Sequence, residues 1–278
     1  MITSLPTRCA LRFGGKPFSN VLYSMLLTST GNGTGVSTIT LTVSASLTLT
    51  LGANAKFYTD AGGTLGESST WTVTTGAART MYLKCTTGTA TMSFSDITKL
   101  TNWGAWTSAT NAASLSGDVS KMIFLTYLRV EGSNTLSGSV AALTSLTYLR
   151  VEGSNTLSGS VEALTLLTSL YVTGSNTLSG DLNPVVSDLT YCVLNSCGMV
   201  DYTAGATWGN AVIIINPSAG YGYSATEIDN MLIDMAASVA LIGKTITLKG
   251  SSAARTAASD AAVAILIGAG RNNTVLTN

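Results

Sequence analysis

Residues 125–140 read LTYLRVEGSNTLSGSV, and residues 146–161 repeat this stretch letter for letter, 21 positions later. A third copy is more divergent but keeps the apolar and glycine positions, with Leu170, Val172, Gly174 and Asn176. One unit of this length cannot bury its apolar side chains alone, whereas stacked units bury them against one another. The repeat therefore predicts a solenoid.

The spacing inside each copy indicates how a coil is built. Two apolar residues lie two positions apart, as Leu128 and Val130 do, so both point to the same side of a short strand. A glycine then ends the strand where the chain must turn. The asparagine that follows recurs in every copy, and its amide can bond turn backbone that no strand satisfies. We therefore expect an asparagine ladder formed by Asn134, Asn155 and Asn176.

The 21-residue spacing continues on both sides of the three copies. Upstream, Leu115 lies 21 positions before Leu136. Downstream, the same spacing places two further pairs of residues on the inner side of their strands, namely Tyr191 with Val193 and Val212 with Ile214. We therefore expect five or six coils between residues 100 and 217.

The coil pattern resembles that of leucine-rich repeats, in which L-x-x-L-x-L is followed by Asn or Cys. Residues 134–140, NTLSGSV, are similar to the N-x-L-S-G-x-I stretch of plant-type repeats, although a Gly-Ser insertion moves the asparagine one place later. In that family, cysteine is the accepted alternative to asparagine. The resemblance therefore implies that Cys197, 21 positions after Asn176, is a structural thiol that continues the ladder.

The regions that flank the repeats have different sequence patterns. Residues 38–51 alternate threonine or serine with apolar residues, which is typical of half-buried strands. Four further strands are expected at 56–58, 69–74, 80–85 and 89–94, and together they predict an antiparallel β-sandwich. The expected fold class is thus β-rich, with this sandwich, a leucine-rich-repeat solenoid and a helix-containing C-terminal cap. The expected divisions are 1–30 for an attachment segment, 31–99 for the sandwich, 100–217 for the solenoid and 218–278 for the cap.

The cap is predicted from helix signals. Ser224 and Glu227 form a capping-box pattern, and a helix is expected over 227–239, with apolar residues at helical spacing. A strand at 245–250, a second helix at about 253–267 and a final strand at 273–277 complete the cap. These elements predict two helix-bearing coils at the C-terminal end of the solenoid.

Composition excludes several classes of function. The chain has 278 residues, no histidine, and 14 basic against 14 acidic residues, so the net charge is zero. Without clustered Lys and Arg, it is a poor candidate for binding nucleic acid or an anionic membrane. Without histidine, it has no Ser-His-Asp unit and lacks the commonest metal ligand. We expect no cofactor, no metal and no membrane insertion, and four cysteines that form no disulfide.

The predicted strands place one set of large side chains on the outer, concave face of the solenoid. These residues are Tyr127, Arg129 and Glu131 in one coil, Tyr148, Arg150 and Glu152 in the next, and Tyr171 and Thr173 in the third. We call the first six the Tyr–Arg–Glu strip. Tyr and Arg are frequent anchors of interfaces, so the strip is the candidate binding surface. The alternative is an ion-pair ladder copied by duplication, with little effect on binding.

Other candidate sites have weaker signals. Trp103 and Trp106 resemble a sugar-stacking pair, but we favour packing against the sandwich core. A polysaccharide-degrading enzyme would need a pair of carboxylates, for which only Asp118, Asp181 and Asp201 lie near strand ends in the β-rich parts. We do not favour this alternative, and we expect no catalytic residues.

The whole arrangement resembles proteins of gut Bacteroidales and their tailed phages. That resemblance implies a structural and adhesive virion protein, a fibre or appendage, that attaches to other virion proteins through its N-terminal region. Its solenoid would bind a protein or glycan on the host surface, and a homo-oligomer is expected. The alternative is a surface or secreted repeat adhesin of a bacterium.

Overall fold

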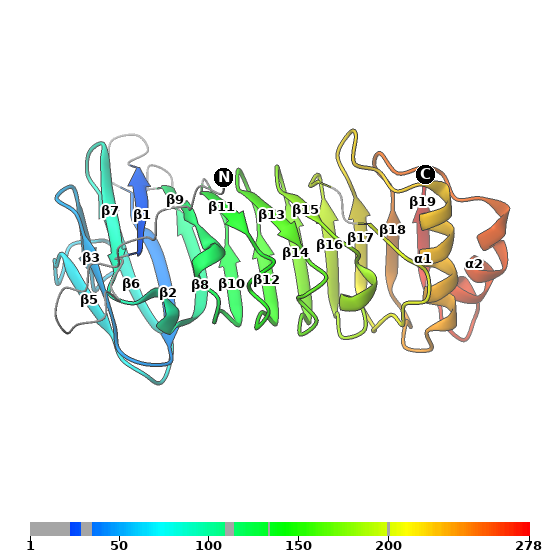
Figure 1. The fold of residues 1–278 in the computed structure, drawn as a ribbon, viewed down its shortest axis with the longest axis horizontal. Coiled ribbons are helices and arrows are strands. Elements are labelled where there is room, and N and C mark those ends of the chain that lie inside the picture. The colour runs from blue at the N-terminus through cyan, green and yellow to red at the C-terminus, as the bar shows by residue number, and fades with distance from the viewer. Residues whose placement is uncertain (1–22, 29–34, 109–113, 133, 199–200) are drawn as a thin grey trace, which may run out of the picture.

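The computed structural model describes residues 23–28, 35–108, 114–132, 134–198 and 201–278. Two β-sheets extend along an elongated molecule, and the two α-helices lie at the C-terminal end (Figure 1). One sheet has eight strands in the order β15-β13-β11-β9-β1-β7-β3-β5. The other has eleven, in the order β19-β18-β17-β16-β14-β12-β10-β8-β2-β6-β4. A single apolar core extends from Met25 to Leu266.

The N-terminal part is antiparallel. Side chains alternate between the core and the surface along its strands, as in β2, where every second residue is buried. The strands are β1 (Tyr23–Thr28), β2 (Ser37–Val43), β3 (Leu47–Leu51), β4 (Ala55–Tyr58), β5 (Thr70–Val73), β6 (Arg79–Cys85) and β7 (Thr89–Phe94). The strands expected from the alternating pattern are confirmed to within about one residue. Residues 23–28 form β1 between β7 and β9, whereas residues 1–22 and 29–30, the rest of the expected attachment segment, lie outside the described residues.

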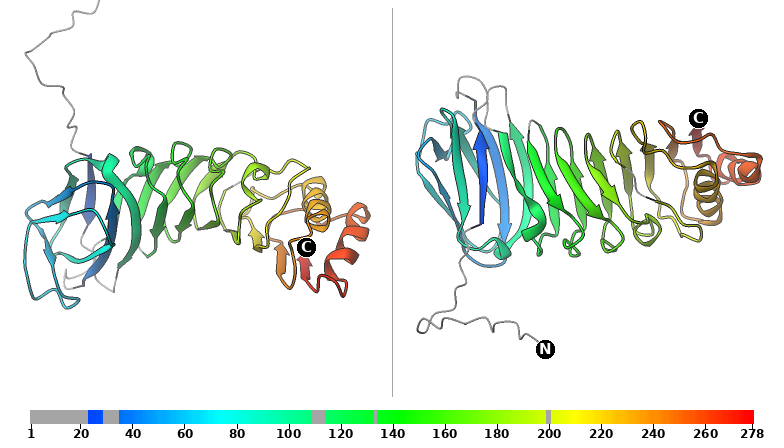
Figure 2. Two further views of the ribbon diagram at one scale, coloured as in Figure 1. Left: turned by 90° about the horizontal axis from the view of Figure 1, so that it is seen from below. Right: turned by 45° about the horizontal axis from the view of Figure 1, so that its top comes forward.

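The solenoid consists of parallel strands from successive coils, as the repeat predicts (Figure 2). Its strands in the eleven-stranded sheet are β8 (Leu100–Ser108), β10 (Tyr127–Val130), β12 (Tyr148–Val151), β14 (Ser169–Thr173), β16 (Tyr191–Asn195) and β17 (Val212–Asn216). Those in the eight-stranded sheet are β9 (Ser114–Asp118), β11 (Thr135–Ser139), β13 (Thr156–Ser160) and β15 (Thr177–Ser179). Short 3-10 helices η1 (Ile97–Lys99), η2 (Val119–Lys121) and η3 (Asn183–Val185) occupy connections between strands.

The antiparallel part and the solenoid share both sheets. β8 pairs antiparallel with β2 on one side and parallel with β10 on the other. In the other sheet, β1 pairs antiparallel with both β7 and β9. The hydrogen-bonded layers therefore pass without interruption from the antiparallel strands into the coils.

The C-terminal end contains the two expected helix-bearing coils. The helix α1 (Ala225–Ala237) precedes β18 (Thr245–Leu248), and η4 (Ala257–Ser259) with α2 (Asp260–Ile267) precedes β19 (Thr274–Thr277). The Ser224–Glu227 capping box is present at the start of α1. The second helix begins at Asp260 rather than near 253, because Thr256 accepts the amide of Ala258 and starts a separate 3-10 turn.

The expected register of the fifth coil is wrong. β16 pairs with β14 so that Cys192 lies opposite Leu170 and Leu194 opposite Val172, a step of 22 residues instead of 21. A shift of one residue moves every side chain of a strand to the other face. Tyr191 is consequently outward, and half of it is exposed, while Cys192 is buried. The next strand inherits the change, so Ile213 and Ile215 are buried in place of Val212 and Ile214.

Candidate functional site

The asparagine side chains tie successive coils together inside the solenoid. Asn134, Asn155 and Asn176 are fully buried. The Oδ1 atoms accept main-chain N–H groups of the preceding coil, from Leu115 at 2.9 Å, Leu136 at 2.8 Å and Leu157 at 2.8 Å. The Nδ2 atoms donate to carbonyls three residues back, those of Glu131, Glu152 and Thr173. Every such bond fixes a turn whose polar groups would otherwise be buried without partners.

On the outer face, the two verbatim copies place equal side chains in register. Tyr127 lies opposite Tyr148 and Arg129 opposite Arg150 in the parallel pair β10–β12. The two tyrosine rings are stacked, with centroids 4.3 Å apart and planes 7° from parallel. The phenols are already aligned in the unbound protein, so little side-chain entropy is lost if a partner docks on them.

The arginines and glutamates of the Tyr–Arg–Glu strip form a continuous ion-pair chain. Glu131 Oε1 accepts Nε of Arg129 at 2.9 Å and also contacts Nε of Arg150 at 3.1 Å. Arg150 in turn donates to Glu152 Oε1, with its Nη2 atom at 2.6 Å. The hydrogen bond to Glu131 raises the pKa of the Arg129 guanidinium. Because these side chains are about one-fifth to one-third exposed, the chain orients the guanidinium groups more than it stabilises the fold.

The third coil continues this face with different chemistry. Tyr171 lies opposite Arg150, whose guanidinium carbon is 4.6 Å from the centre of the Tyr171 ring, which is cation–π geometry. Thr173 is half-buried at the end of β14. Beyond it, Nδ2 of Asn216 donates to Oδ1 of Asn195 at 2.9 Å, so the edge of the face becomes amide-rich.

A hollow of about 370 Å³ lies on this outer face, next to the Tyr–Arg–Glu strip. Its lining consists of Tyr148, Arg150, Ser169, Tyr171, Tyr191, Val193, Val212 and Ile214. The first two belong to the strip, and Tyr171 was also a candidate from the sequence. Tyr191, Val193, Val212 and Ile214 were missed, because the 21-residue spacing placed them inside the core.

A sequence signal for the missed residues exists in the Leu-Thr pairs that begin the coils. These pairs start at Leu125, Leu146, Leu167 and Leu189, so the last interval is 22 residues. Each of the last three threonines donates its hydroxyl to the carbonyl of its predecessor, as Thr190 does to Thr168 at 2.8 Å. Aligning on these pairs would have placed Tyr191 on the outer face.

The buried cysteines have no polar role in this face. Cys192 and Cys197 form no disulfide, and burial raises the pKa of Cys192 to about 12 and that of Cys197 to about 11. Because the coil is one residue longer, the position 22 residues after Asn176 is Gly198, and its N–H donates to the Asn176 carbonyl. Cys197 therefore lies one position before the place that the asparagine occupies in the earlier coils. Cys9 is outside the described residues.

The carboxylates considered for catalysis hold local turns. Asp118 Oδ1 accepts the amide of Ser120 at 2.8 Å, and Asp181 Oδ1 accepts the amides of Asn183 at 2.8 Å and Thr203 at 3.1 Å. Asp181 also lies beside Asp201 in a parallel bridge. Although burial raises the pKa of Asp181, its hydrogen bonds with Thr203 and Asn183 more than compensate and lower it.

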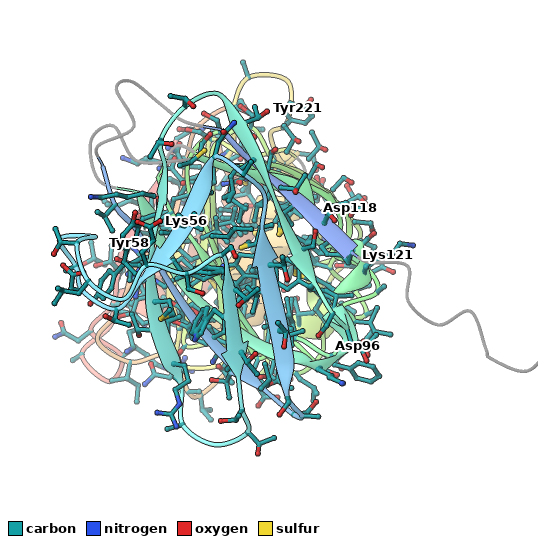
Figure 3. All side chains as sticks on the ribbon, turned by 90° about the vertical axis from the view of Figure 1, so that its left-hand side faces the viewer. Lys56, Tyr58, Asp96, Asp118, Lys121 and Tyr221 are labelled. Carbon is teal, nitrogen blue, oxygen red and sulfur yellow. The ribbon has the colours of Figure 1, made fainter. Side chains whose placement is uncertain are left out.

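A larger hollow, of about 640 Å³, lies where the antiparallel part meets the first coil. Asp118 and Lys121 line it and lie near each other at one edge of the molecule in Figure 3, which looks onto the end formed by the antiparallel strands. The Tyr23 hydroxyl is buried and has no hydrogen-bond partner among the described residues. Burial, and then the charge of Asp118, raise the pKa of Tyr23.

The tryptophans of the first coil differ in what the structure describes. Trp103 is buried, and its ring centroid lies 5.9 Å from that of Phe94, so it packs in the core and does not form a surface stacking platform. The side chain of Trp106 lies outside the described part of the chain.

Comparisons with family models, curated proteins and solved structures give no match to this chain. The fold itself defines a β-solenoid of about five turns that continues antiparallel sheets and ends in two helix-bearing coils. Within the described ranges, no group of three or more His, Cys, Asp or Glu side chains is arranged to hold a metal ion. None of the helices described is long and apolar enough to cross a bilayer.

Proposed function

We propose that this chain is a non-enzymatic structural and adhesive protein whose binding surface is the outer face of the eleven-stranded sheet. The observation that supports this most directly is the pre-set array of the Tyr–Arg–Glu strip, with stacked Tyr127 and Tyr148 beside arginines held by glutamates. Tyr and Arg are enriched among the few residues that dominate the affinity of protein interfaces. The partner would be a protein or glycan on a cell surface.

The proposal includes the repeat type. Buried leucines and valines two positions apart, together with the asparagine side chains that bond the preceding coil, support a leucine-rich-repeat solenoid. The 22-residue step at the fifth coil and the Gly-Ser insertion depart from a uniform repeat.

We further propose that the protein is a fibre or appendage of a tailed-phage virion, with a bacterial surface adhesin as the alternative. The resemblance to proteins of gut Bacteroidales and their phages supports the first, in which the N-terminal region contacts other virion proteins. Mass spectrometry of purified particles tests it: the chain should be present in the particles, and its presence only in a bacterial envelope fraction would support the alternative.

A homo-oligomer is part of the proposal, and the C-terminal end supports it. β19 is the last strand of its sheet and has no charged residue, while Leu276 and Ile267 are 41% and 53% exposed. Uncharged edge strands readily pair with another chain. Sedimentation should show an oligomer that the substitution Leu276→Lys dissociates, and a monomer at all concentrations would contradict this part.

The binding surface is tested by replacing Tyr127, Arg129, Tyr148 and Arg150 together with Ser. Flow cytometry on gut Bacteroidales cells should show that the unchanged protein binds a susceptible strain and that the quadruple variant does not. A matched control, Thr135→Ala with Thr156→Ala, changes exposed residues of the other sheet and should bind normally. Normal binding by a folded quadruple variant would make the strip an ion-pair ladder and the solenoid a spacer.

A further inference from the structure

The column of outward tyrosines has a gap in the third coil. Tyr148 pairs in register with Ser169, and Ser169 pairs with Tyr191. The first residue of each of the strands β10, β12, β14 and β16 points outward, and these residues are Tyr127, Tyr148, Ser169 and Tyr191. A serine stands where a third ring would continue the stack, and Tyr191 resumes it one strand further on.

The gap has the size of one ring. Adjacent parallel strands lie about 4.8 Å apart, so the strands of Tyr148 and Tyr191 are separated by about two such steps. On this sheet, one step sets two rings 4.3 Å apart, as Tyr127 and Tyr148 show. The space above Ser169 belongs to the 370 Å³ hollow, and the serine at its floor is itself buried. The spacing of the strands therefore leaves room for one planar group between the two tyrosines.

The surroundings select the kind of ring. Val193, Val212 and Ile214 border the hollow on the side away from the strip, so most of its wall beside Tyr191 is aliphatic. Arg150 is already engaged by Glu131 and Glu152, which leaves it poorly placed to bind an anion. A sugar ring would bring several hydroxyls against aliphatic side chains, where polar groups without partners are costly. An aromatic ring requires only stacking and apolar contact.

We propose that an aromatic side chain of a protein partner inserts above Ser169, between Tyr148 and Tyr191, and completes the tyrosine column. The inference rests on the proposed function, because it takes the outer face of the eleven-stranded sheet as the binding face. It narrows the partner to a protein that presents an exposed Tyr, Phe or Trp. The 22-residue step is what makes the site, since a 21-residue step would turn Tyr191 into the core.

The test uses N-acetyl-L-tyrosinamide as the probe and NMR titration of the full chain. Saturable shifts are expected at the amides of Ser169 and Tyr191. Ser169→Tyr fills the gap with the protein's own ring and should abolish them, whereas Thr156→Tyr adds an exposed tyrosine to the other sheet and should leave them unchanged. Tyr191→Ala removes one wall and should weaken binding roughly 2- to 12-fold.

Several results would overturn the inference. They are the absence of saturable shifts in the unchanged protein, retained binding in the folded Ser169→Tyr variant, and equal binding of N-acetyl-L-leucinamide, which has no ring. Shifts at the same amides with methyl β-glucopyranoside, but not with the tyrosine amide, would replace the protein partner with a glycan. If the quadruple strip variant loses cell binding while the probe never binds, the binding face stands and only the ring site is wrong. If the probe binds but the quadruple variant still binds cells as well as the unchanged protein does, the ring site stands and the proposed function is wrong.

Discussion

The main-chain N–H of Leu136 donates a 2.8 Å hydrogen bond to Oδ1 of Asn155, and this single bond joins two successive coils at a fully buried position. The same asparagine donates from Nδ2 to the carbonyl of Glu152 in its own coil. Each rung therefore satisfies one donor from the coil before and one acceptor from its own turn. The stacking of coils depends on these polar contacts as well as on buried leucines.

Asn155→Ala should consequently lower the free energy of unfolding by about 1–3 kcal/mol, because it leaves a buried N–H and a buried carbonyl without partners. Arg150→Ala, on the outer face of the same coil, should cost less than about 1 kcal/mol, since that side chain is one-third exposed. Urea unfolding of both variants measures the difference. Equal losses would argue against the ladder as a stabilising element.

Much of this architecture could be predicted from local repetition. The strands of the two identical copies, the inward Leu128 and Val130 and the position of Asn155 follow from period-two spacing and one internal repeat. Alternation likewise predicts β2 and β3, where buried residues recur at every second position. Such features depend only on neighbours along the chain.

Tyr191 shows what the repeat could not reveal. The segment Tyr191-Cys192-Val193-Leu194 is apolar at all four positions, so alternation cannot decide which pair is buried. Between Val185 and Leu189 there are three residues, whereas the earlier coils have two, as between Leu164 and Leu167. This one-residue insertion reverses both faces of the strand, and with it the position of the hollow. The register had to come from pairing between strands.

A second prediction concerns the close stacking of glycines at the turns. Gly153 has a φ of +98°, and a Cβ there would collide with the carbonyl oxygen of Gly132 in the coil before. Gly76 has a φ of +120°, but a Cβ there meets nothing within 4 Å. Both Gly→Ala variants incur backbone strain, and only Gly153→Ala adds overlap. Its loss of unfolding free energy should exceed that of Gly76→Ala by about 1–3 kcal/mol.

Thermal and urea unfolding of the two variants would check this prediction. The comparison isolates the overlap, because both variants carry the cost of placing alanine at a positive φ angle. Similar stabilities would mean that the coils separate easily at this turn, and that the glycine is required only for its φ angle.

A third prediction concerns Asp234, which holds the C-terminal helix α1 against the preceding loop. Its Oδ2 atom accepts the hydroxyl of Tyr202 at 2.8 Å and the amides of Gly205 at 2.7 Å and Ala206 at 3.1 Å. Trp208 Nε1 donates to the same Tyr202 hydroxyl at 2.9 Å. The carboxylate thus satisfies three donors at a buried position.

Asp234→Ala should lower stability by about 3 kcal/mol and increase amide exchange in residues 201–208 and in α1, because charged acceptors make the stronger hydrogen bonds. Asp188→Ala removes an exposed carboxylate and should change neither quantity appreciably. Hydrogen exchange followed by mass spectrometry gives both readouts. If exchange in the loop is the same for the two variants, the carboxylate does not anchor the helix.

The last prediction is a loss of stability at alkaline pH that originates in the buried thiols. Burial raises the pKa of Cys192 to about 12 and that of Cys197 to about 11. Burial also raises the pKa of Tyr223, and the negative charges of the two thiolates would raise it further. An unfolded cysteine titrates near 8.5. Between about pH 8.5 and pH 11 to 12, the unfolded chain therefore binds fewer protons than the folded one, and stability falls as pH rises. The slope should reach up to about 1.4 kcal/mol per pH unit for each thiol.

Replacing Cys192 and Cys197 together with Ala should flatten this slope between pH 9 and pH 11, although the variant is less stable at neutral pH because it loses buried atoms. The remaining slope comes from tyrosines such as Tyr202, whose pKa burial also raises, and it is common to both proteins. Urea unfolding at several pH values, with reductant present, measures the two slopes. Parallel curves would mean that the thiols reach solvent and titrate in the folded protein, and that the fifth coil opens without unfolding of the whole solenoid.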